Sequence, residues 1–223
     1  MKKAQKRNAG ANDSRSAKSN AIVLAALELF TRYGYRKTSV DDIARAAQVA
    51  KRTVYLHFEN KAAVFLAILE YFGDRVRQGC VGAERMAGTP VDRLTGLLDA
   101  YFGMEFELFS KSDHVPELED TFSKLARSRI GGLNTEYQDW LARFLRSLEK
   151  TGEIGKPPQG LTVEQIVQIV MRAAEGAKHD PKAQGDRKAL ERRLRELAML
   201  TLAAMKPELE HGSLARRRDT QGT

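Results

Sequence analysis

Residues 41–61 read DDIARAAQVAKRTVYLHFENK, a pattern that fits two short helices joined by a tight turn. Ser39 stands three residues ahead of Asp42, and a hydroxyl followed at that spacing by a carboxylate is typical of a capped helix start. We therefore expect one helix over about 40–47 and a second over 51–57. The apolar side chains expected to pack these helices together as a helix-turn-helix are Ile43, Ala44, Ala47, Val49, Val54 and Phe58.

The second of these helices has a cationic, aromatic and exposed face. Arg52, Tyr55 and Leu56 stand at positions i, i+3 and i+4, which share one side of a helix. Such a face suits insertion into the major groove of DNA. Arginine can donate two hydrogen bonds to guanine, whereas leucine gains only from apolar contact, as with a thymine methyl group.

The net charge of +8 is confined to the N-terminal quarter of the chain. Residues 1–61 hold 13 Lys and Arg against 5 Asp and Glu, whereas residues 62–223 hold 24 of each class. Basic surfaces attract polyanions and gain affinity from counterion release. The asymmetry therefore favours nucleic acid as the partner of the N-terminal region.

Composition excludes several other classes of protein. The chain has 223 residues, 42% of them apolar, and no apolar run long enough for a membrane span or a secretory signal, so we expect a folded cytoplasmic protein without membrane contact. The single cysteine, Cys80, cannot form an intramolecular disulfide. The histidines lack metal-ligand spacing, and no phosphate-binding loop or nucleophile motif is present. We therefore expect no enzyme activity, no metal and no cofactor.

A basic arm and a bracing helix precede the helix-turn-helix. Residues 1–15 are cationic and carry almost no large apolar side chain, which predicts a disordered arm that either follows the DNA backbone or is an inert tail. From about residue 16 to Gly34 the pattern predicts a helix, because glycine commonly ends one. Its apolar stripe consists of Ile22, Ala26, Leu29, Phe30 and Tyr33.

Residues 18–66 contain, in order, the elements AA..LF, GY..TS, DIA..A.V, TVY.HF and K. This order resembles the N-terminal DNA-binding domain of the TetR/AcrR family of bacterial transcriptional regulators. Two positions depart from the family pattern: Gln48 replaces a frequent turn glycine, and Ala50 replaces the Ser or Thr that usually caps the recognition helix. Loss of such a cap costs about 0.5–2 kcal/mol of local stability.

The resemblance implies a set of residues that contact DNA. His57 has an equally weighted alternative as a packed structural residue beside Phe58. The residues expected at phosphates are Thr38, Ser39, Tyr55, His57 and Lys61; those expected near base edges are Lys51, Arg52 and Leu56, and Thr53 completes the set.

The rest of the chain is also predicted to be helical. The expected architecture is all-α, with a three-helix helix-turn-helix domain at 16–62, a helical effector-binding and dimerisation domain at 63–205 and a disordered tail at 206–223. The helices expected in the second domain cover about 61–86, 90–110, 116–129, 132–150, 162–178 and 187–205.

The helix at 90–110 is apolar nearly all round, which predicts a central, buried position. Its aromatic side chains either pack the core or line an effector cavity, together with residues at helical spacing further along the chain. The candidate pocket residues are Tyr101, Phe102, Met104, Phe106, Tyr137, Trp140, Phe144 and Met171.

The last two helices carry stripes suited to helix packing within one chain or across a dimer. The family resemblance favours a homodimer, with the interface on Val163, Val167, Val170, Leu190, Leu194, Leu197, Ala198 and Thr201. The implied function is a dimeric regulator that binds double-stranded operator DNA, a repressor released by a small-molecule effector. The alternative is a ligand-independent DNA-binding protein whose second domain only dimerises.

Overall fold

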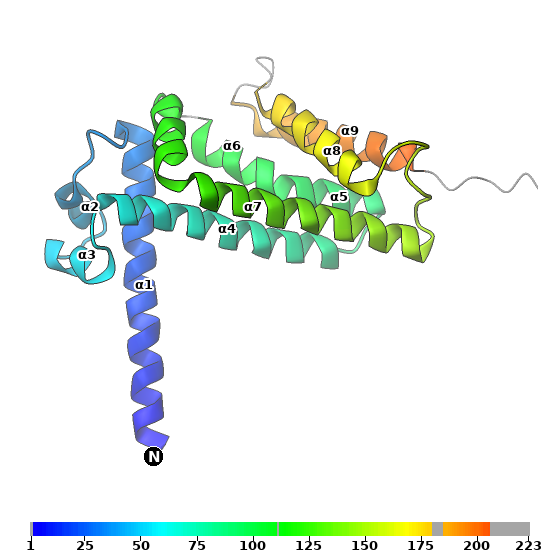
Figure 1. Ribbon diagram of the computed structural model, residues 1–223. Coiled ribbons are helices and arrows are strands. Elements are labelled where there is room, and N and C mark those ends of the chain that lie inside the picture. Colours follow the sequence, from blue (N-terminus) through cyan, green and yellow to red (C-terminus); the bar gives the residue numbers. More distant parts are fainter. Residues whose placement is uncertain (1, 111, 180–184, 206–223) are drawn as a thin grey trace, which may run out of the picture.

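The computed structural model describes residues 2–110, 112–179 and 185–205, and side chains for 16–110, 112–127, 129–179 and 185–205. Every regular element in these ranges is a helix, which confirms the all-α prediction (Figure 1). The predicted tail at 206–223 lies outside the described residues. The helices are α1 (Lys2–Tyr33), α2 (Val40–Ala46), α3 (Lys51–His57), α4 (Lys61–Arg85), α5 (Pro90–Leu98), the π-helix η1 (Asp99–Gly103), α6 (Met104–Phe109), α7 (Val115–Thr151), α8 (Val163–Lys178) and α9 (Arg187–Ala204).

Helices α1, α2 and α3 form a small domain at one end of the molecule (Figure 1). The predicted cap of α2 is present, because the Asp42 amide donates to the Ser39 hydroxyl at 3.2 Å and the Ser39 amide donates to the Asp42 carboxylate at 3.0 Å. The core of this domain, called the N-terminal cluster below, also takes in residues from α4 and α7. Its buried members are Ile22, Val23, Ala26, Leu27, Phe30, Ile43, Ala44, Val54, Val64, Phe65, Ile68 and Leu118.

Helix α4 joins the two halves of the molecule. Val64 and Phe65 at its start are buried in the N-terminal cluster, and Val76, Cys80 and Ala83 near its end are buried in a second, larger cluster. Burial raises the pKa of the Cys80 thiol to about 12. Among the described residues, no helix has the length and apolarity needed to cross a membrane.

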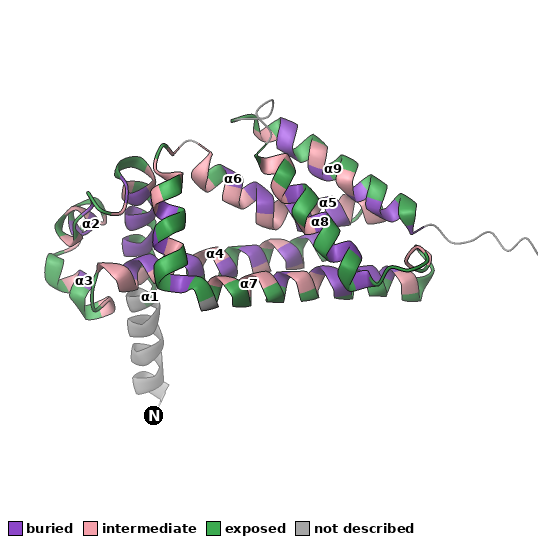
Figure 2. Ribbon diagram, turned by 45° about the horizontal axis from the view of Figure 1, so that its top comes forward, coloured by how far each residue is buried: buried purple, intermediate pink, exposed green. Residues whose placement is uncertain are grey.

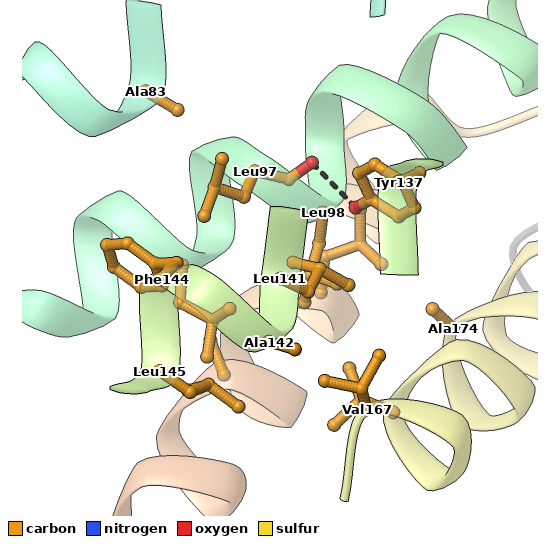
Figure 3. Packing of buried hydrophobic residues seen from close by; sticks show 14 of the residues in the cluster. Ala83, Leu97, Leu98, Tyr137, Leu141, Ala142, Phe144, Leu145, Val167 and Ala174 are labelled. Atoms are coloured by element: carbon orange, nitrogen blue, oxygen red, sulfur yellow. Dashed lines mark hydrogen bonds between the residues drawn. The ribbon is translucent and has the colours of Figure 1, made fainter. Parts of the chain in front are cut away.

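The second cluster lies between α4, α5, α7, α8 and α9. Figure 3 shows Leu97 and Leu98 of α5 near Tyr137 and Leu141 of α7. Val167 of α8 belongs to the same cluster and approaches it from a third helix. The Tyr137 hydroxyl donates to the Leu97 carbonyl at 2.8 Å, so its polar end is satisfied inside the core.

Two predicted helix boundaries are wrong. The helices expected at 116–129 and 132–150 form one element, α7, which runs through Gly131 and Gly132 and is kinked at Ala126 (φ −138°, ψ 16°). Two glycines weaken a helix by about 1 kcal/mol each relative to alanine, but packing of the flanking turns outweighs that cost. The helix expected at 90–110 is divided by η1.

Helix α1 begins at Lys2, whereas the sequence predicts a disordered arm over 1–15. The segment lacks proline and holds several alanine, lysine and arginine residues, which favour helix. Figure 1 shows this part of α1 extending well beyond the other helices.

Candidate functional site

The outer face of α3 is exposed as the sequence predicts. Arg52 is exposed, and the side chains of Tyr55 and Leu56 are 49% and 63% exposed, while Val54 on the opposite face is 1% exposed. Figure 2 shows α3 at one end of the molecule, with much of its ribbon coloured as exposed. A cation, a phenol and an aliphatic side chain thus share one accessible face on a helix seven residues long.

Lys51, at the start of α3, forms an ion pair with Asp41 of α2. The Lys51 ammonium lies 2.8 Å from the Asp41 carboxylate, and both side chains are about half exposed (51% and 54%). The hydrogen bond to Asp41 raises the pKa of Lys51. This pair crosses the helix-turn-helix at the surface, where a phosphate or a base edge would compete with Asp41 for the ammonium.

Lys61 and Thr38 hold the turn between α1 and α2. The Lys61 ammonium donates to the carbonyl oxygens of Tyr35 and Thr38 at 2.8 and 2.9 Å. Partial burial lowers the pKa of Lys61. The Thr38 side chain is buried, and its hydroxyl donates to the Gly34 carbonyl at 2.8 Å. Both residues therefore have structural contacts that the sequence pattern does not reveal.

The remaining predicted DNA contacts lie close to this surface. Ser39 is exposed, whereas Thr53 and His57 are half-buried, and the His57 ring centre lies 6.3 Å from that of Phe58. Six of the nine predicted residues thus lie on α3, Lys61 begins α4, and Thr38 and Ser39 lie in the turn that leads into α2. Their contacts with DNA stay predictions.

The two departures from the family pattern have local consequences. Gln48 adopts a left-handed backbone (φ 55°), which glycine would adopt at lower cost. Ala50 is the N-cap of α3 and provides no side-chain hydrogen bond to the helix. The start of α3 is consequently held less firmly than the start of α2.

A cavity of about 690 Å³ lies between α4, η1, α6, the first half of α7 and the end of α8. More than half of its lining residues are apolar, and five of them are aromatic. The aromatic residues are Phe72, Tyr101, Phe106, Phe109 and Phe122; the other apolar residues are Ile68, Leu69, Leu108, Val115, Leu118, Ile130 and Leu133. This size and character suit a small organic ligand.

Only two of the eight predicted pocket residues, Tyr101 and Phe106, line this cavity. The other six lie in the second cluster or against it: Phe102, Tyr137 and Phe144 are buried there, and Met104, Trp140 and Met171 pack at its edge. Helical spacing predicts that residues share a face, but it does not distinguish a face that meets another helix from one that meets a void.

Phe109 and Phe122 also line the cavity, although the sequence pattern did not predict them there. Phe122 lies in the first turns of α7, and its ring centre is 4.2 Å from that of Phe65 in the N-terminal cluster. The kink at Ala126 turns this part of α7 toward the N-terminal domain. The sequence has no recognisable signal for this kink. The break in the helix was expected at Gly131 and Gly132 instead.

Glu105 and Lys178 are charged residues of the cavity lining, and they form an ion pair with each other. The Lys178 ammonium is 2.8 Å from a carboxylate oxygen of Glu105 and 2.8 Å from one of Glu175, and its side chain is only 10% exposed. Burial raises the pKa of Glu105, and Lys178 opposes that shift. Tyr101 donates from its hydroxyl to the Asn134 side-chain oxygen at 2.6 Å. Within the described residues, no group of three or more His, Cys, Asp or Glu side chains is placed to hold a metal ion.

The predicted dimer interface requires a correction. Seven of its eight side chains are buried within the protomer and the eighth, Leu197, packs against the same core, because the apolar stripes of α8 and α9 face α5 and α7. They are therefore unavailable to a partner. The exposed large apolar side chains of these two helices are Ile169, Met199 and Leu200, at 53%, 52% and 70% exposure.

Comparison with known proteins identifies similar sequences and folds. Residues 22–68 match a family model described as bacterial regulatory proteins, tetR family. The transcriptional activator FasR of Mycolicibacterium smegmatis is 29% identical over 127 residues, which cover 52% of this chain and 58% of that relative. The fatty acid degradation regulator FadR of Bacillus halodurans has a similar fold (TM-score 0.61, 20% identity, 86% of this chain and 97% of that one). The regulator FadR of Bacillus subtilis, solved in complex with stearoyl-CoA, is also similar (TM-score 0.59, 20% identity, 83% and 98%).

Proposed function

We propose that this chain, whose residues 22–68 match the tetR family model, is a DNA-binding transcriptional regulator that acts as a homodimer, and that a small molecule in the cavity controls its release from operator DNA. The observation that carries this proposal is that the cavity and the N-terminal cluster share a wall. Ile68, Leu118 and Phe122 line the cavity, and each is also part of the N-terminal cluster or packed against it. A ligand that moves this wall would also move the DNA-binding domain.

Recognition of DNA is assigned to α3. Its exposed face offers Arg52 for guanine and Leu56 for a thymine methyl group, and Tyr55 for the backbone. Lys61 keeps a third ammonium hydrogen for a phosphate after its two carbonyl bonds. The basic N-terminal region supplies the attraction that is independent of sequence.

The effector is proposed to be a mostly apolar molecule with a polar end. The apolar lining would hold its body, and Glu105, Lys178 and the Tyr101–Asn134 pair lie where its polar end would be recognised. The similar FadR of Bacillus subtilis is described in complex with stearoyl-CoA, a ligand with a long apolar chain. Acyl compounds are therefore the first ligands to test.

The homodimer is proposed to form on the outer faces of α8 and α9. Ile169, Met199 and Leu200 are the large apolar side chains exposed there, and adjacent small residues such as Ala173 and Ala203 permit close approach of a second copy. We further propose that the protein works in the cytoplasm as a repressor, without catalysis of its own.

The test is selection of bound fragments from genomic DNA by the purified protein, followed by footprinting. We expect two inverted half-sites whose centres are roughly 34–36 Å apart or a multiple of that distance. Titration of the complex with acyl compounds of increasing chain length should then reduce operator occupancy. Specific binding that no apolar compound alters would favour the ligand-independent alternative, and binding without sequence preference would contradict the proposal.

A further inference from the structure

The first turns of α7 contact the DNA-binding domain at the turn that leads into α2. A Glu117 carboxylate oxygen accepts a hydrogen bond from the Arg36 amide at 2.7 Å. The Ser112 hydroxyl donates to the Thr31 carbonyl at 2.6 Å, close to the end of α1. A Cβ atom added at Gly34 would collide with the Glu117 carboxylate, so the two segments are in close contact.

These contacts come from the segment that also forms the cavity wall. Val115 and Leu118, on either side of Glu117, line the cavity, and so do Ser112 and Phe122. Leu118 is at the same time buried in the N-terminal cluster. Contacts with the cavity and with the DNA-binding domain thus alternate along fewer than four turns of helix.

The kink at Ala126 separates this segment from the rest of α7. Residues 115–125 lie beside α1, whereas the remainder of the helix runs along α4, and its buried residues Tyr137, Leu141 and Leu145 belong to the second cluster (Figure 1). A helix bends most readily where its backbone departs from helical angles, as it does at Ala126. Residues 115–125 can therefore shift while the second cluster stays packed.

The turn itself is held from two sides. Lys61 of α4 donates to the carbonyls of Tyr35 and Thr38, and Glu117 of α7 accepts from the amide of Arg36, the residue next to Tyr35. The turn ends at Ser39, the N-cap of α2, so its position fixes where the helix-turn-helix begins. Loss of the Glu117 contact would leave the turn held by Lys61 of α4 and by the hydrogen bond from Thr38 to Gly34 within the turn.

We propose that Glu117 is a positioning residue: its carboxylate holds the α1–α2 turn in the DNA-binding conformation, and a ligand that displaces the cavity wall withdraws it. The positioning of the turn by Glu117 concerns the folded protein alone. Its withdrawal by a ligand rests on the proposed function. An effector needs contacts that differ between two conformations. Val115, Leu118 and Phe122 supply such contacts, and Glu117 carries the displacement to the turn.

The first experiment measures operator affinity of the full-length protein for Glu117→Ala, Glu117→Gln and the control Asp120→Ala. Asp120 lies one turn away, and its carboxylate pairs with Lys124 of the same helix. Removal of either negative charge should by itself raise DNA affinity slightly. We expect Asp120→Ala to follow that trend and Glu117→Ala to oppose it, because a fall in the DNA-competent fraction to about one tenth weakens binding about tenfold.

Glu117→Gln keeps an acceptor oxygen and should recover much of the affinity lost in Glu117→Ala. Thermal unfolding of each variant shows whether it is folded. If Glu117→Ala is not folded, the operator affinity of Glu117→Gln is compared with that of the wild type instead. Equal or higher affinity for all three variants than for the wild type would overturn the assignment of Glu117.

The second experiment uses the apolar anionic dye 1-anilinonaphthalene-8-sulfonate as the cavity probe. In the wild type, dye and operator should weaken each other's binding by the same factor, about 5-fold or more. In Glu117→Ala the dye should bind free protein as in the wild type, since Glu117 does not line the cavity. The factor by which dye and operator weaken each other's binding should, however, fall toward one. A factor unchanged in Glu117→Ala would overturn transmission through this residue.

The two proposals fail in different ways. A dye that does not bind the wild type, or binds without affecting the operator, contradicts the effector cavity and with it the transmission. The operator affinities of the Glu117 variants still decide whether this carboxylate positions the turn.

Discussion

The ammonium of Lys61 lies 2.8 Å from the carbonyl oxygen of Tyr35 and 4.3 Å from the centre of the Tyr35 ring. A residue that the family resemblance assigns to phosphate is therefore also part of the domain's internal structure. Lysine has three ammonium hydrogens, and the carbonyls of Tyr35 and Thr38 accept two of them. One residue can thus brace the turn and still reach DNA.

Lys61→Met should lower the free energy of unfolding by roughly 1–3 kcal/mol, because two charge-assisted hydrogen bonds are lost while the apolar stem remains. The same change should reduce the slope of log affinity against log salt concentration by about 0.9. Urea unfolding and operator titration at several salt concentrations measure the two effects. Lys37→Met, at an exposed position, is the control for stability. A normal slope with reduced stability would leave Lys61 a structural role only.

Ala50→Ser should stabilise the protein by about 0.5–2 kcal/mol, the usual range for a helix cap. Ala50 already has the extended backbone of an N-cap (φ −67°, ψ 144°) but no side-chain hydrogen bond to α3. The matched change is Ser39→Ala, which removes the existing cap of α2 and should destabilise by a similar amount. Denaturant midpoints give both values. If Ala50→Ser has no effect, the start of α3 does not limit stability.

The helix-turn-helix was predictable because its signals are local. The hydroxyl–carboxylate pair at Ser39 and Asp42 fixes where α2 begins, and the i, i+3, i+4 pattern of Arg52, Tyr55 and Leu56 identifies the exposed face of α3. Such information lies within one or two helical turns. The position of Lys61 beneath the turn depends on α4 and α1 meeting, which no short pattern contains.

The cavity and the dimer faces were harder to predict because they depend on packing between distant segments. Tyr137 and Phe122 are both aromatic residues of α7, but the kink at Ala126 sends one to the core and the other to the cavity wall. The stripes of α8 and α9 correctly indicated buried faces. They did not indicate whether α5 and α7 or a second copy buries them.

Acid should destabilise the contact between α5 and α9 through Asp92. Hydrogen bonds from Thr89, and one from Arg195 of α9 at 2.7 Å, lower the pKa of Asp92 from 3.8 to about 2. A carboxylate whose pKa is lower in the folded state stabilises the protein above pH 3.8, and this contribution is lost as the pH falls toward 2. Asp92→Asn should therefore flatten the fall of the urea midpoint in this pH range. Arg195→Gln should flatten this fall in part. If the urea midpoint of both variants falls with pH as it does in the wild type, Asp92 is not the group responsible.

Ile169→Asp should convert the proposed dimer to a folded monomer, because it places a charge on an exposed apolar face of α8. Ala198→Asp should instead unfold the protein, since Ala198 is fully buried in the second cluster. Sedimentation gives the oligomeric state, and circular dichroism reports folding. A dimeric Ile169→Asp variant with normal operator affinity would locate the interface elsewhere.

The specificity of α3 should divide between Arg52 and Leu56, which lie one helical turn apart on its exposed face. Arg52→Ala should cost about 1–3 kcal/mol of binding and relax the preference at one G·C position, because a bidentate contact with guanine is lost. Leu56→Ala should cost less and relax the preference at a neighbouring A·T position. Leu56 is 63% exposed, so its removal should scarcely alter folding.

Replacement of the contacted thymine by uracil removes only the methyl group and should reproduce, in the wild-type protein, the loss of affinity caused by Leu56→Ala. In the Leu56→Ala variant the same replacement should add nothing. Additive losses would mean that Leu56 acts through the packing of the helix and not through the methyl group.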